Sequence, residues 1–247
     1  MIRFENVSFA YGHRQALEQM TCEWREGQIV GLIGPNGSGK STSLRLGAGL
    51  LAPQAGQVLW NGADLKTYSP KQIARGIGFL PQRQTVPGMT VRTLVEQGRY
   101  PYTGLAHRLG QQDREAVEEA LELTGMAELA HRSLASLSGG QLQKAYLAMV
   151  MAQQTQHILL DEPMTYLDIG HQLEVAALLR KMANAGRSVV VVLHDLGQAM
   201  ACCDVLQVVH RGRLIFTGEP EQLLVSGALE TAFGVRPQWR EGLHFTK

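Results

Sequence analysis

The sequence predicts an α/β fold in which a parallel sheet is interrupted by a helical insertion. Residues 28–33 form a continuous apolar run, typical of a strand buried on both faces of a parallel sheet, and a glycine-rich loop and a helix follow it. Apolar runs return at residues 157–161 and 188–193. Between residues 82 and 155, strand-like runs disappear and helical periodicity dominates. The strands of one sheet are therefore expected on both sides of an inserted helical segment.

The first part of the chain is expected to contain strands of a second kind. Residues 4–9 and 17–24 alternate between apolar and polar side chains on either side of Tyr11 and Gly12, which predicts an antiparallel pair. The other elements expected here are a helix from residue 40 to about residue 50, a short hairpin at 58–62 and a strand at 77–80 that ends at Pro81.

Helices are expected inside the insertion at residues 114–123 and 141–153. A further helix at 171–184 is expected to connect the two parallel strands that follow the insertion. The chain then closes with predicted strands at 205–209 and 213–216, a turn at Arg211 and Gly212 between them, and short helices at 220–224 and 227–233.

The composition favours a folded globular protein. Its 247 residues are 45% hydrophobic and 18% charged, which is enough for a full core. There are 23 Lys and Arg residues against 22 Asp and Glu residues, with no block of like charge, so a nucleic-acid partner is not expected. The longest apolar stretch, residues 188–193, is far shorter than the ~20 residues of a membrane helix.

The cellular location is expected to be cytoplasmic. Residues 1–5 lack the charged-then-apolar order of a signal peptide. Cys202 and Cys203 are adjacent and Cys22 is remote, which is neither a disulfide framework nor a metal-binding pattern. Both observations indicate a protein of a reducing compartment.

Residues 34–41 match the pattern G-x-x-x-x-G-K-[ST] between a buried strand and a helix. Glycines there let successive N–H groups point inward at the positive end of the helix, which forms an anion site. Lys40 is expected to reach the β- and γ-phosphates of a nucleotide and the Ser41 hydroxyl to bind Mg²⁺. The structural alternative is a glycine-rich turn with an exposed lysine. The candidate nucleotide-binding residues of this segment are Gly34, Pro35, Asn36, Gly37, Ser38, Gly39, Lys40, Ser41 and Thr42.

Asp161 and Glu162 follow an apolar strand, at the edge of an open sheet where α/β proteins bind ligands. Asp161 is expected to hold the Mg²⁺ shell, and Glu162 to polarise the water that attacks the γ-phosphate. The alternative is a pair of solvated acids at a strand end. The phosphate loop in the same chain favours the catalytic interpretation.

Ser138 and Gln141 form a capping-box pattern at the start of a long helix, and a well-capped helix is the plain interpretation. Capping does not require Gly139 and Gly140, because a glycine costs about 1 kcal/mol relative to alanine in a helix interior. A bare backbone would open this helix N-terminus to an anion. Residues 138–141 are therefore a second candidate phosphate site.

These motifs, with Gln82, Asp168 and His194, occur in the order and approximate spacing of an ABC-type ATPase, and the resemblance covers the whole chain. It implies a single domain with a RecA-like core and an antiparallel β-subdomain, from residues 1–82 and 156–247, and a helical subdomain from 83–155. It also implies a head-to-tail dimer with a second copy of the chain. ATP and Mg²⁺ would then lie between one subunit's phosphate loop and residues 138–141 of the other.

Four residues take their roles from this resemblance. Tyr11 corresponds to the aromatic residue that stacks on adenine, and His194 to the switch residue that contacts the γ-phosphate. Gln82 corresponds to the residue that contacts Mg²⁺ and senses the transmembrane partner, and Asp168 to an aspartate that communicates across the dimer. Taken alone, Tyr11 would be an ordinary turn aromatic and His194 a residue at a strand end. The predicted catalytic residues are Lys40, Gln82, Glu162 and His194, and the predicted Mg²⁺ ligands are Ser41, Gln82 and Asp161.

Residues 90–101, 165–168 and 194–196 resemble those of ATPases that serve importers of ferric siderophores, haem and cobalamin. The resemblance implies transmembrane permease subunits as partners, a substrate-binding protein as an indirect partner, and a location at the cytoplasmic face of the cell membrane. Ser43, Lys144 and Met164 depart from the usual residues of the family. The alternatives are a soluble ABC ATPase acting on nucleic acid or ribosomes, a P-loop kinase, and a non-hydrolysing binding module, which the presence of Glu162 disfavours.

Residues 83–105 are expected to dock the permease. The segment interleaves apolar and aromatic residues with arginines, and these types are enriched in protein interfaces. A solvated loop with a few packed side chains is the alternative. The residues in question are Val86, Met89, Tyr100 and Tyr102, with Arg83, Arg92 and Arg99.

Overall fold

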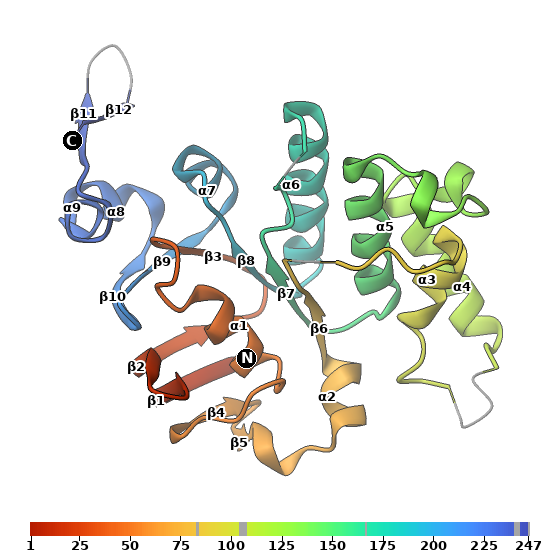
Figure 1. Cartoon of the computed structure of the whole chain (residues 1–247), viewed down its shortest axis with the longest axis horizontal. Helices are drawn as coiled ribbons and strands as arrows, with labels where there is room; N and C mark the ends of the chain where they lie inside the picture. The colour runs from red at the N-terminus through yellow and green to blue at the C-terminus, as the bar shows by residue number, and fades with distance from the viewer. Residues whose placement is uncertain (83, 104–107, 166, 240–242, 247) are drawn as a thin grey trace.

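The computed structural model of the chain describes residues 1–82, 84–103, 108–165, 167–239 and 243–246. In these residues, a four-stranded antiparallel sheet lies beside a six-stranded sheet, and a group of helices forms one end of the molecule (Figure 1). The predicted α/β class, with an antiparallel β-subdomain and an inserted helical subdomain, is confirmed.

The antiparallel sheet has the strand order β2-β1-β4-β5. β1 (Ile2–Tyr11) and β2 (Arg14–Trp24) are joined by a tight turn that places Tyr11 directly opposite Arg14. β4 (Ala55–Trp60) pairs with the other edge of β1, and β5 (Ala63–Asp64) extends the sheet. These strands confirm the predicted antiparallel pair and the short hairpin.

The central sheet has the strand order β10-β9-β3-β8-β7-β6. Its strands run parallel except for the edge strand β10, which is antiparallel to β9. Every residue of β3, β7 and β8 is buried, as their continuous apolar runs predict. The strands are β3 (Ile29–Ile33), β6 (Ile77–Leu80), β7 (His157–Asp161), β8 (Ser188–Val192), β9 (Val205–His210) and β10 (Arg213–Gly218).

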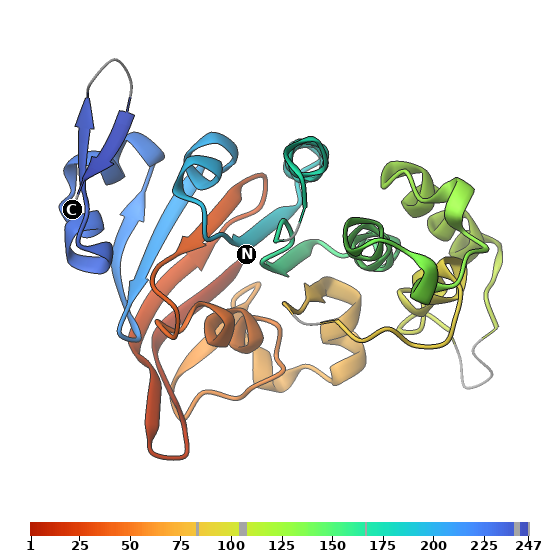
Figure 2. The ribbon, with the colours of Figure 1, turned by 45° about the horizontal axis from the view of Figure 1, so that its top comes forward.

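The two faces of the central sheet are covered by different layers (Figure 2). Because side chains alternate along a strand, Val30 and Leu32 pack towards the antiparallel sheet and α1 (Lys40–Gly47), whereas Ile29 and Ile33 pack towards helices on the other face. Those helices are α6 (Ile169–Asn184), α7 (Leu196–Cys202), α8 (Pro220–Val225) and α9 (Ala228–Phe233).

The helical subdomain lies between β6 and β7 in sequence and forms the right-hand end of Figure 1. Its helices are α3 (Val91–Gln97), α4 (Gln111–Leu123) and α5 (Gly139–Ala152), which pack around Leu94, Val117, Leu121 and Leu147. In the described parts of the chain, none of the helices is both long and apolar enough to span a bilayer.

Several elements differ from the sequence-based expectation. α1 ends at Gly47 rather than near residue 50, because Gly49 adopts a left-handed φ of 68° and turns the chain out of the helix. α2 (Pro70–Gly76), capped by Ser69, and α7 were not predicted. The hairpin of β11 (Arg236–Trp239) and β12 (Leu243–Thr246) was also not predicted.

Candidate active site

The carboxyl edge of the central sheet borders a cavity of about 690 Å³. The phosphate loop after β3, the start of α1, the β1–β2 hairpin and residues after β6, β7 and β8 line it. These segments meet because parallel strands place their carboxyl ends at one edge of the sheet. Of the predicted residues, Tyr11, residues 36–42, Gln82, Glu162 and His194 line this cavity.

The phosphate loop has a backbone that only glycine accommodates at two positions. Gly34 has a φ of 150° and Gly39 a φ of 114°, both in the left-handed half of the map. A Cβ on Gly34 would lie 2.1 Å from the Val209 carbonyl oxygen, and one on Gly39 would lie 2.5 Å from the Ala16 carbonyl oxygen. The two glycines therefore let the loop pack tightly between the core strand β9 and the β-subdomain.

Lys40 is folded back over the loop that carries it. Its Nζ donates hydrogen bonds to the carbonyl oxygens of Gly34, at 2.7 Å, and Pro35, at 3.0 Å. Burial lowers the pKa of Lys40, and the nearby carboxylates of Glu162 and Asp161 oppose this shift. The ammonium group therefore donates to two neutral carbonyl oxygens, and a bound anion would give it a charged partner.

Asp161 and Ser41 bring two hard oxygen ligands together behind the cavity. The Ser41 hydroxyl donates to Asp161 Oδ1 at 3.0 Å, and Asp161 is only 1% exposed. Burial raises the pKa of Asp161, although the hydrogen bond from Ser41 opposes this. A buried carboxylate beside a hydroxyl fits a divalent cation such as Mg²⁺, which prefers oxygen ligands.

Glu162 and His194 form a pair at the wall of the cavity. His194 Nε2 contacts Glu162 Oε1, and the Thr165 hydroxyl donates to the other carboxylate oxygen at 3.3 Å. The Glu162 side chain is 8% exposed and that of His194 42% exposed. The carboxylate is therefore fixed from two sides, while the imidazole stays open to the cavity.

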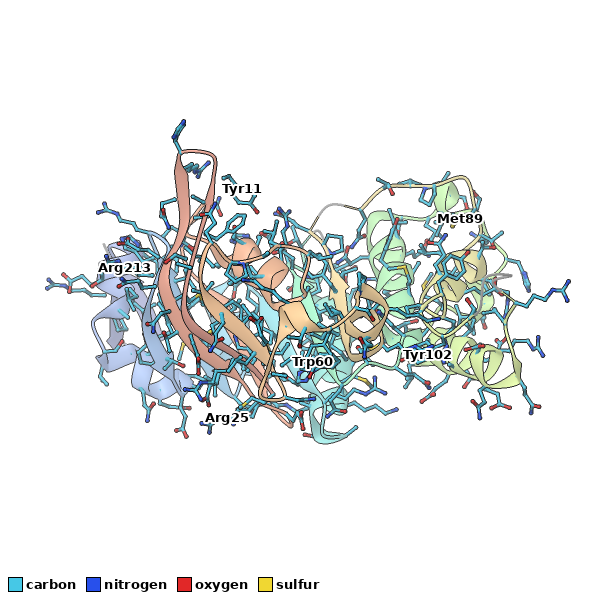
Figure 3. The ribbon with its side chains drawn as sticks, turned by 90° about the horizontal axis from the view of Figure 1, so that it is seen from below. Tyr11, Arg25, Trp60, Met89, Tyr102 and Arg213 are labelled. Carbon is cyan, nitrogen blue, oxygen red and sulfur yellow. The ribbon has the colours of Figure 1, made fainter. Side chains whose placement is uncertain are left out.

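Tyr11 projects from the β1–β2 hairpin beside the cavity (Figure 3). Its ring packs edge-on against Phe9, with 4.9 Å between ring centroids, and its hydroxyl accepts a 3.4 Å hydrogen bond from Arg45. The residue remains 44% exposed. An aromatic face held in this way at a cavity rim is suited to stack on a base.

Residues 138–141 form the predicted capping box at the start of α5. Gln141 N–H donates to the Ser138 hydroxyl at 3.3 Å, and Ser138 N–H donates to the Gln141 side chain at 3.1 Å. A Cβ on Gly139 would meet no atom within 4 Å, whereas one on Gly140 would lie 3.2 Å from Leu167. These residues do not line the cavity around Lys40, so the two motifs are not brought together within one chain.

Asp168 caps α6 and lies outside the cavity. Its carboxylate accepts a 2.9 Å hydrogen bond from the His171 N–H, and the His171 ring lies 2.8 Å from its other oxygen. The side chain is 69% exposed. Its contacts here are those of a helix cap, and its exposure leaves it accessible to a partner.

The expectation for residues 83–105 is partly wrong. Val86 and Tyr100 are exposed, but Arg99 is only 5% exposed; it forms an ion pair with Asp113 and stacks over the Tyr102 ring. Arg99 also donates to the Ala152 carbonyl oxygen at the end of α5, so its guanidinium links α4 to α5 and is not exposed as expected. Arg83 and Leu105 lie outside the described residues.

Arg14 and Ala16 also line the cavity, although neither was predicted from the sequence as a site residue. The signal that was available is their place on the hairpin, because Arg14 follows the Tyr11 turn and pairs across it. A cation so close to an expected base-stacking residue is itself a candidate ligand-binding residue.

Comparison with known proteins identifies the family. The family described as "ABC transporter" matches residues 17–165. The ferric enterobactin transport ATP-binding protein FepC of Escherichia coli (strain K12) is 40% identical over 237 residues, 95% of this chain and 88% of that protein. The petrobactin import ATP-binding protein FpuC of Bacillus anthracis is also 40% identical over 237 residues, 95% of this chain and 87% of that protein.

Among solved structures, an inward-facing metal-chelate type ABC transporter matches with a TM-score of 0.83 and 29% identity. The match covers 99% of this chain and 96% of the matched chain. The similarity therefore includes the β-subdomain, the central sheet and the helical subdomain. This chain belongs to the ABC transporter family, as an ATP-binding subunit that hydrolyses ATP.

Proposed function

We propose that the chain energises a membrane importer for a ferric siderophore or a related chelate such as haem or cobalamin. The names of the two relatives, FepC and FpuC, support the siderophore class. The main support for ATP hydrolysis is the Glu162–His194 pair, which lies at the wall of the cavity that the phosphate loop also lines.

In this proposal, the nucleotide lies along the cavity from Tyr11 to Lys40. Adenine stacks on the exposed ring of Tyr11, and the N–H groups of residues 34–42 bind the phosphates. Lys40 exchanges the carbonyl oxygens of Gly34 and Pro35 for phosphate oxygens, which are the stronger acceptors because they are charged.

Ser41 and Asp161 would hold Mg²⁺, with Gln82 as a further oxygen ligand from the loop after β6. When bound, the ion neutralises charge on the phosphates. The protein's own contribution is to bury Asp161 and to hold its Oδ1 with a hydrogen bond from the Ser41 hydroxyl.

Glu162 is the proposed acceptor of the proton from the attacking water. Its carboxylate is mostly buried and is held by His194 and Thr165, so it keeps one orientation while the water is positioned. His194 reaches from β8 to the same point and is open to the cavity, where it contacts the γ-phosphate. Hydrolysis then yields ADP and phosphate without a covalent intermediate.

A second copy of the chain completes the site in this proposal. Gly139 and Gly140 lie in the first turn of α5, where N–H groups have no partner within the helix, and residues 138–141 do not line the cavity of their own chain. They therefore serve a nucleotide only if that nucleotide is bound to another subunit, which is the head-to-tail arrangement. Asp168 is exposed at the start of α6 and is proposed to contact the partner subunit there.

Permease subunits are the remaining proposed partners. Gln82 is exposed at the cavity, and Val86 and Tyr100 are exposed later in the segment between the cavity and the helical subdomain. In this proposal, that segment receives a cytoplasmic part of the permease and links it to the nucleotide. The proposed location is therefore the cytoplasmic face of the cell membrane, with a substrate-binding protein as an indirect partner.

The test is transport by the complete assembly. The chain is reconstituted with its permease subunits in liposomes containing ATP, and uptake of a labelled ferric siderophore, haem and cobalamin is measured. Uptake of one chelate that stops with Glu162→Gln supports the proposal and identifies the substrate. ATP hydrolysis without uptake of any of the three would overturn the substrate class and leave the ATPase assignment intact.

A further inference from the structure

Arg14 is the first residue of β2 and lies directly opposite Tyr11 across the turn at Gly12. The two residues therefore share the end of one hairpin, whose position beside the cavity is marked by Tyr11 in Figure 3. Both side chains line that cavity. The hairpin thus presents an aromatic ring and a guanidinium to the same ligand space.

The Arg14 guanidinium lies against the middle of the phosphate loop. A Cβ built on Gly37 would lie 3.0 Å from Arg14 Nη2, which is closer than ordinary side-chain contact. Gly37 also has a left-handed φ of 76°, which favours glycine. The missing side chain leaves space for the guanidinium. Lys40, in contrast, contacts the beginning of the loop, at Gly34 and Pro35. The loop therefore has one cation at its start and another at its middle.

Arg14 has no anionic partner within the part of the chain that the structure describes. Arg25, directly after β2, pairs with Glu23, and Arg213 pairs with Glu18 across β2 and β10. Among the described residues, none forms an ion pair or hydrogen bond with the Arg14 side chain. Glu162, whose carboxylate lines the same cavity, contacts His194 instead. The guanidinium is therefore available to an anion that enters the cavity.

We propose that Arg14 binds the phosphates of the nucleotide beyond the α-phosphate, as a second cation that acts from the β-subdomain. This inference rests on the proposed role of the cavity as the nucleotide site. A planar guanidinium donates two parallel N–H bonds to phosphate oxygens, which a lysine ammonium does not. Because Tyr11 lies on the same hairpin, one hairpin would contact both the base and the phosphates.

The test measures equilibrium affinity in the full-length protein. Dissociation constants for ATP and ADP are obtained by titration calorimetry, and for AMP by competition with ATP, in the wild type and in Arg14→Ala. We expect Arg14→Ala to weaken ATP and ADP about tenfold, the effect of one charge-assisted hydrogen bond at a partly exposed site, and to leave AMP unchanged. Arg14→Lys is expected to recover part of the loss, because it restores the charge but not the fork.

Arg25→Ala is the matched control, since it removes an exposed arginine next to the other end of β2 that lies outside the cavity. Its nucleotide affinities are expected to equal those of the wild type. Unchanged ATP affinity in Arg14→Ala would overturn the inference. An equal loss of AMP affinity would also overturn it, because the contact would then lie at the ribose or the α-phosphate. A loss of ATP affinity that coincides with a lower urea midpoint would overturn it as well.

Lys40→Ala separates this inference from the proposed function. If Lys40→Ala retains full ATP affinity, the cavity is not the nucleotide site and both proposals fail. If Lys40→Ala loses ATP affinity and Arg14→Ala does not, only the role of Arg14 is overturned.

Discussion

The carboxylate of Glu162 contacts the imidazole of His194, and the Glu162 backbone has a left-handed φ of 56°. Glu162 is the first residue after β7, and His194 follows β8, the neighbouring strand. A left-handed conformation in a residue with a Cβ costs about 1–3 kcal/mol. Strain is thus stored at the residue to which we assign proton transfer, and the contact with His194 helps to fix its side chain.

The first prediction concerns Glu162→Gln. ATP affinity is expected to be retained, while phosphate release falls by roughly 10² to 10⁴-fold, because an amide does not accept the proton of the attacking water. With ATP and Mg²⁺ the variant is expected to accumulate as a dimer in size-exclusion chromatography with light scattering. Glu221→Gln, at an exposed position of α8, is the control. A variant that hydrolyses ATP at the wild-type rate would contradict the role of Glu162.

Lys40→Ala is expected to abolish both ATP binding and hydrolysis, because the loop loses the ammonium group that neutralises the phosphates. The measurement is phosphate release at saturating ATP together with calorimetric affinity. Lys66→Ala, at an exposed site of the β-subdomain, is expected to have no effect. Turnover that is unchanged in Lys40→Ala would disprove the assignment of residues 34–41.

Gly139→Ala distinguishes a helix cap from an anion site. A Cβ at residue 139 would have no described atom within 4 Å outside its own helical turn, so the variant is expected to be as stable as the wild type or more stable, by up to about 1 kcal/mol. Its ATP hydrolysis is nevertheless expected to fall, because the methyl group would lie where the partner's nucleotide approaches. Urea unfolding and phosphate release are measured side by side. Full activity would leave only the capping role.

Gly47 allows the indole of Trp24 to pack against α1. A Cβ on Gly47 would lie 2.3 Å from the Trp24 ring, which is completely buried and donates a 3.0 Å hydrogen bond to Gln207. Gly47→Ala is therefore expected to destabilise the fold by about 1–3 kcal/mol through overpacking. Combining it with Trp24→Leu should relieve the clash, so the double variant is expected to lose less than the sum of the single losses in urea unfolding.

The buried His157 side chain is expected to make the free energy of unfolding depend on pH. Burial, with a smaller effect of the N-terminal ammonium, lowers the pKa of His157 to about 4. The unfolded chain, with an ordinary pKa near 6.5, binds this proton first as the pH falls, so stability is full above about pH 6.5 and decreases towards pH 4. The loss from this residue is up to about 3 kcal/mol.

The corresponding measurement compares the wild type with His157→Leu, which keeps the buried site apolar. The urea midpoint of the wild type is expected to fall more steeply between pH 6.5 and 4.5 than that of the variant. Identical slopes would show that another group controls the pH dependence.

The elements that the sequence predicted correctly are those in which local residues decide the structure. The loop at residues 34–41 requires glycine at defined φ values, and the capping box of α5 joins residues only three apart. Continuous apolar runs identified β3, β7 and β8, because burial on both faces excludes polar side chains.

The expectations that were wrong, or missing, concern contacts between distant segments. Arg99 has the sequence features of a surface cation, but Asp113 and the Ala152 carbonyl oxygen, which come from two other helices, draw it into the interior. Arg14 gains its position only because β1 and β2 bring it to a loop that follows β3. The contacts of Arg99 have no signature within its own stretch of sequence, and the hairpin pattern around Arg14 indicates that Tyr11 is its neighbour but not which loop it reaches.

The strands that enter and leave the helical subdomain, β6 and β7, are paired with each other at the edge of the sheet. The chain therefore crosses the boundary at one place, and Lys144 of α5 contacts Glu174 of α6 beside it. Side-chain contacts add to this connection, since Arg75 of α2 donates to the Pro101 carbonyl oxygen at 2.9 Å. Any rotation of the helical subdomain about this boundary would move residues 138–141 together with the exposed residues Val86 and Tyr100, which in our proposal links the partner subunit's nucleotide to the permease.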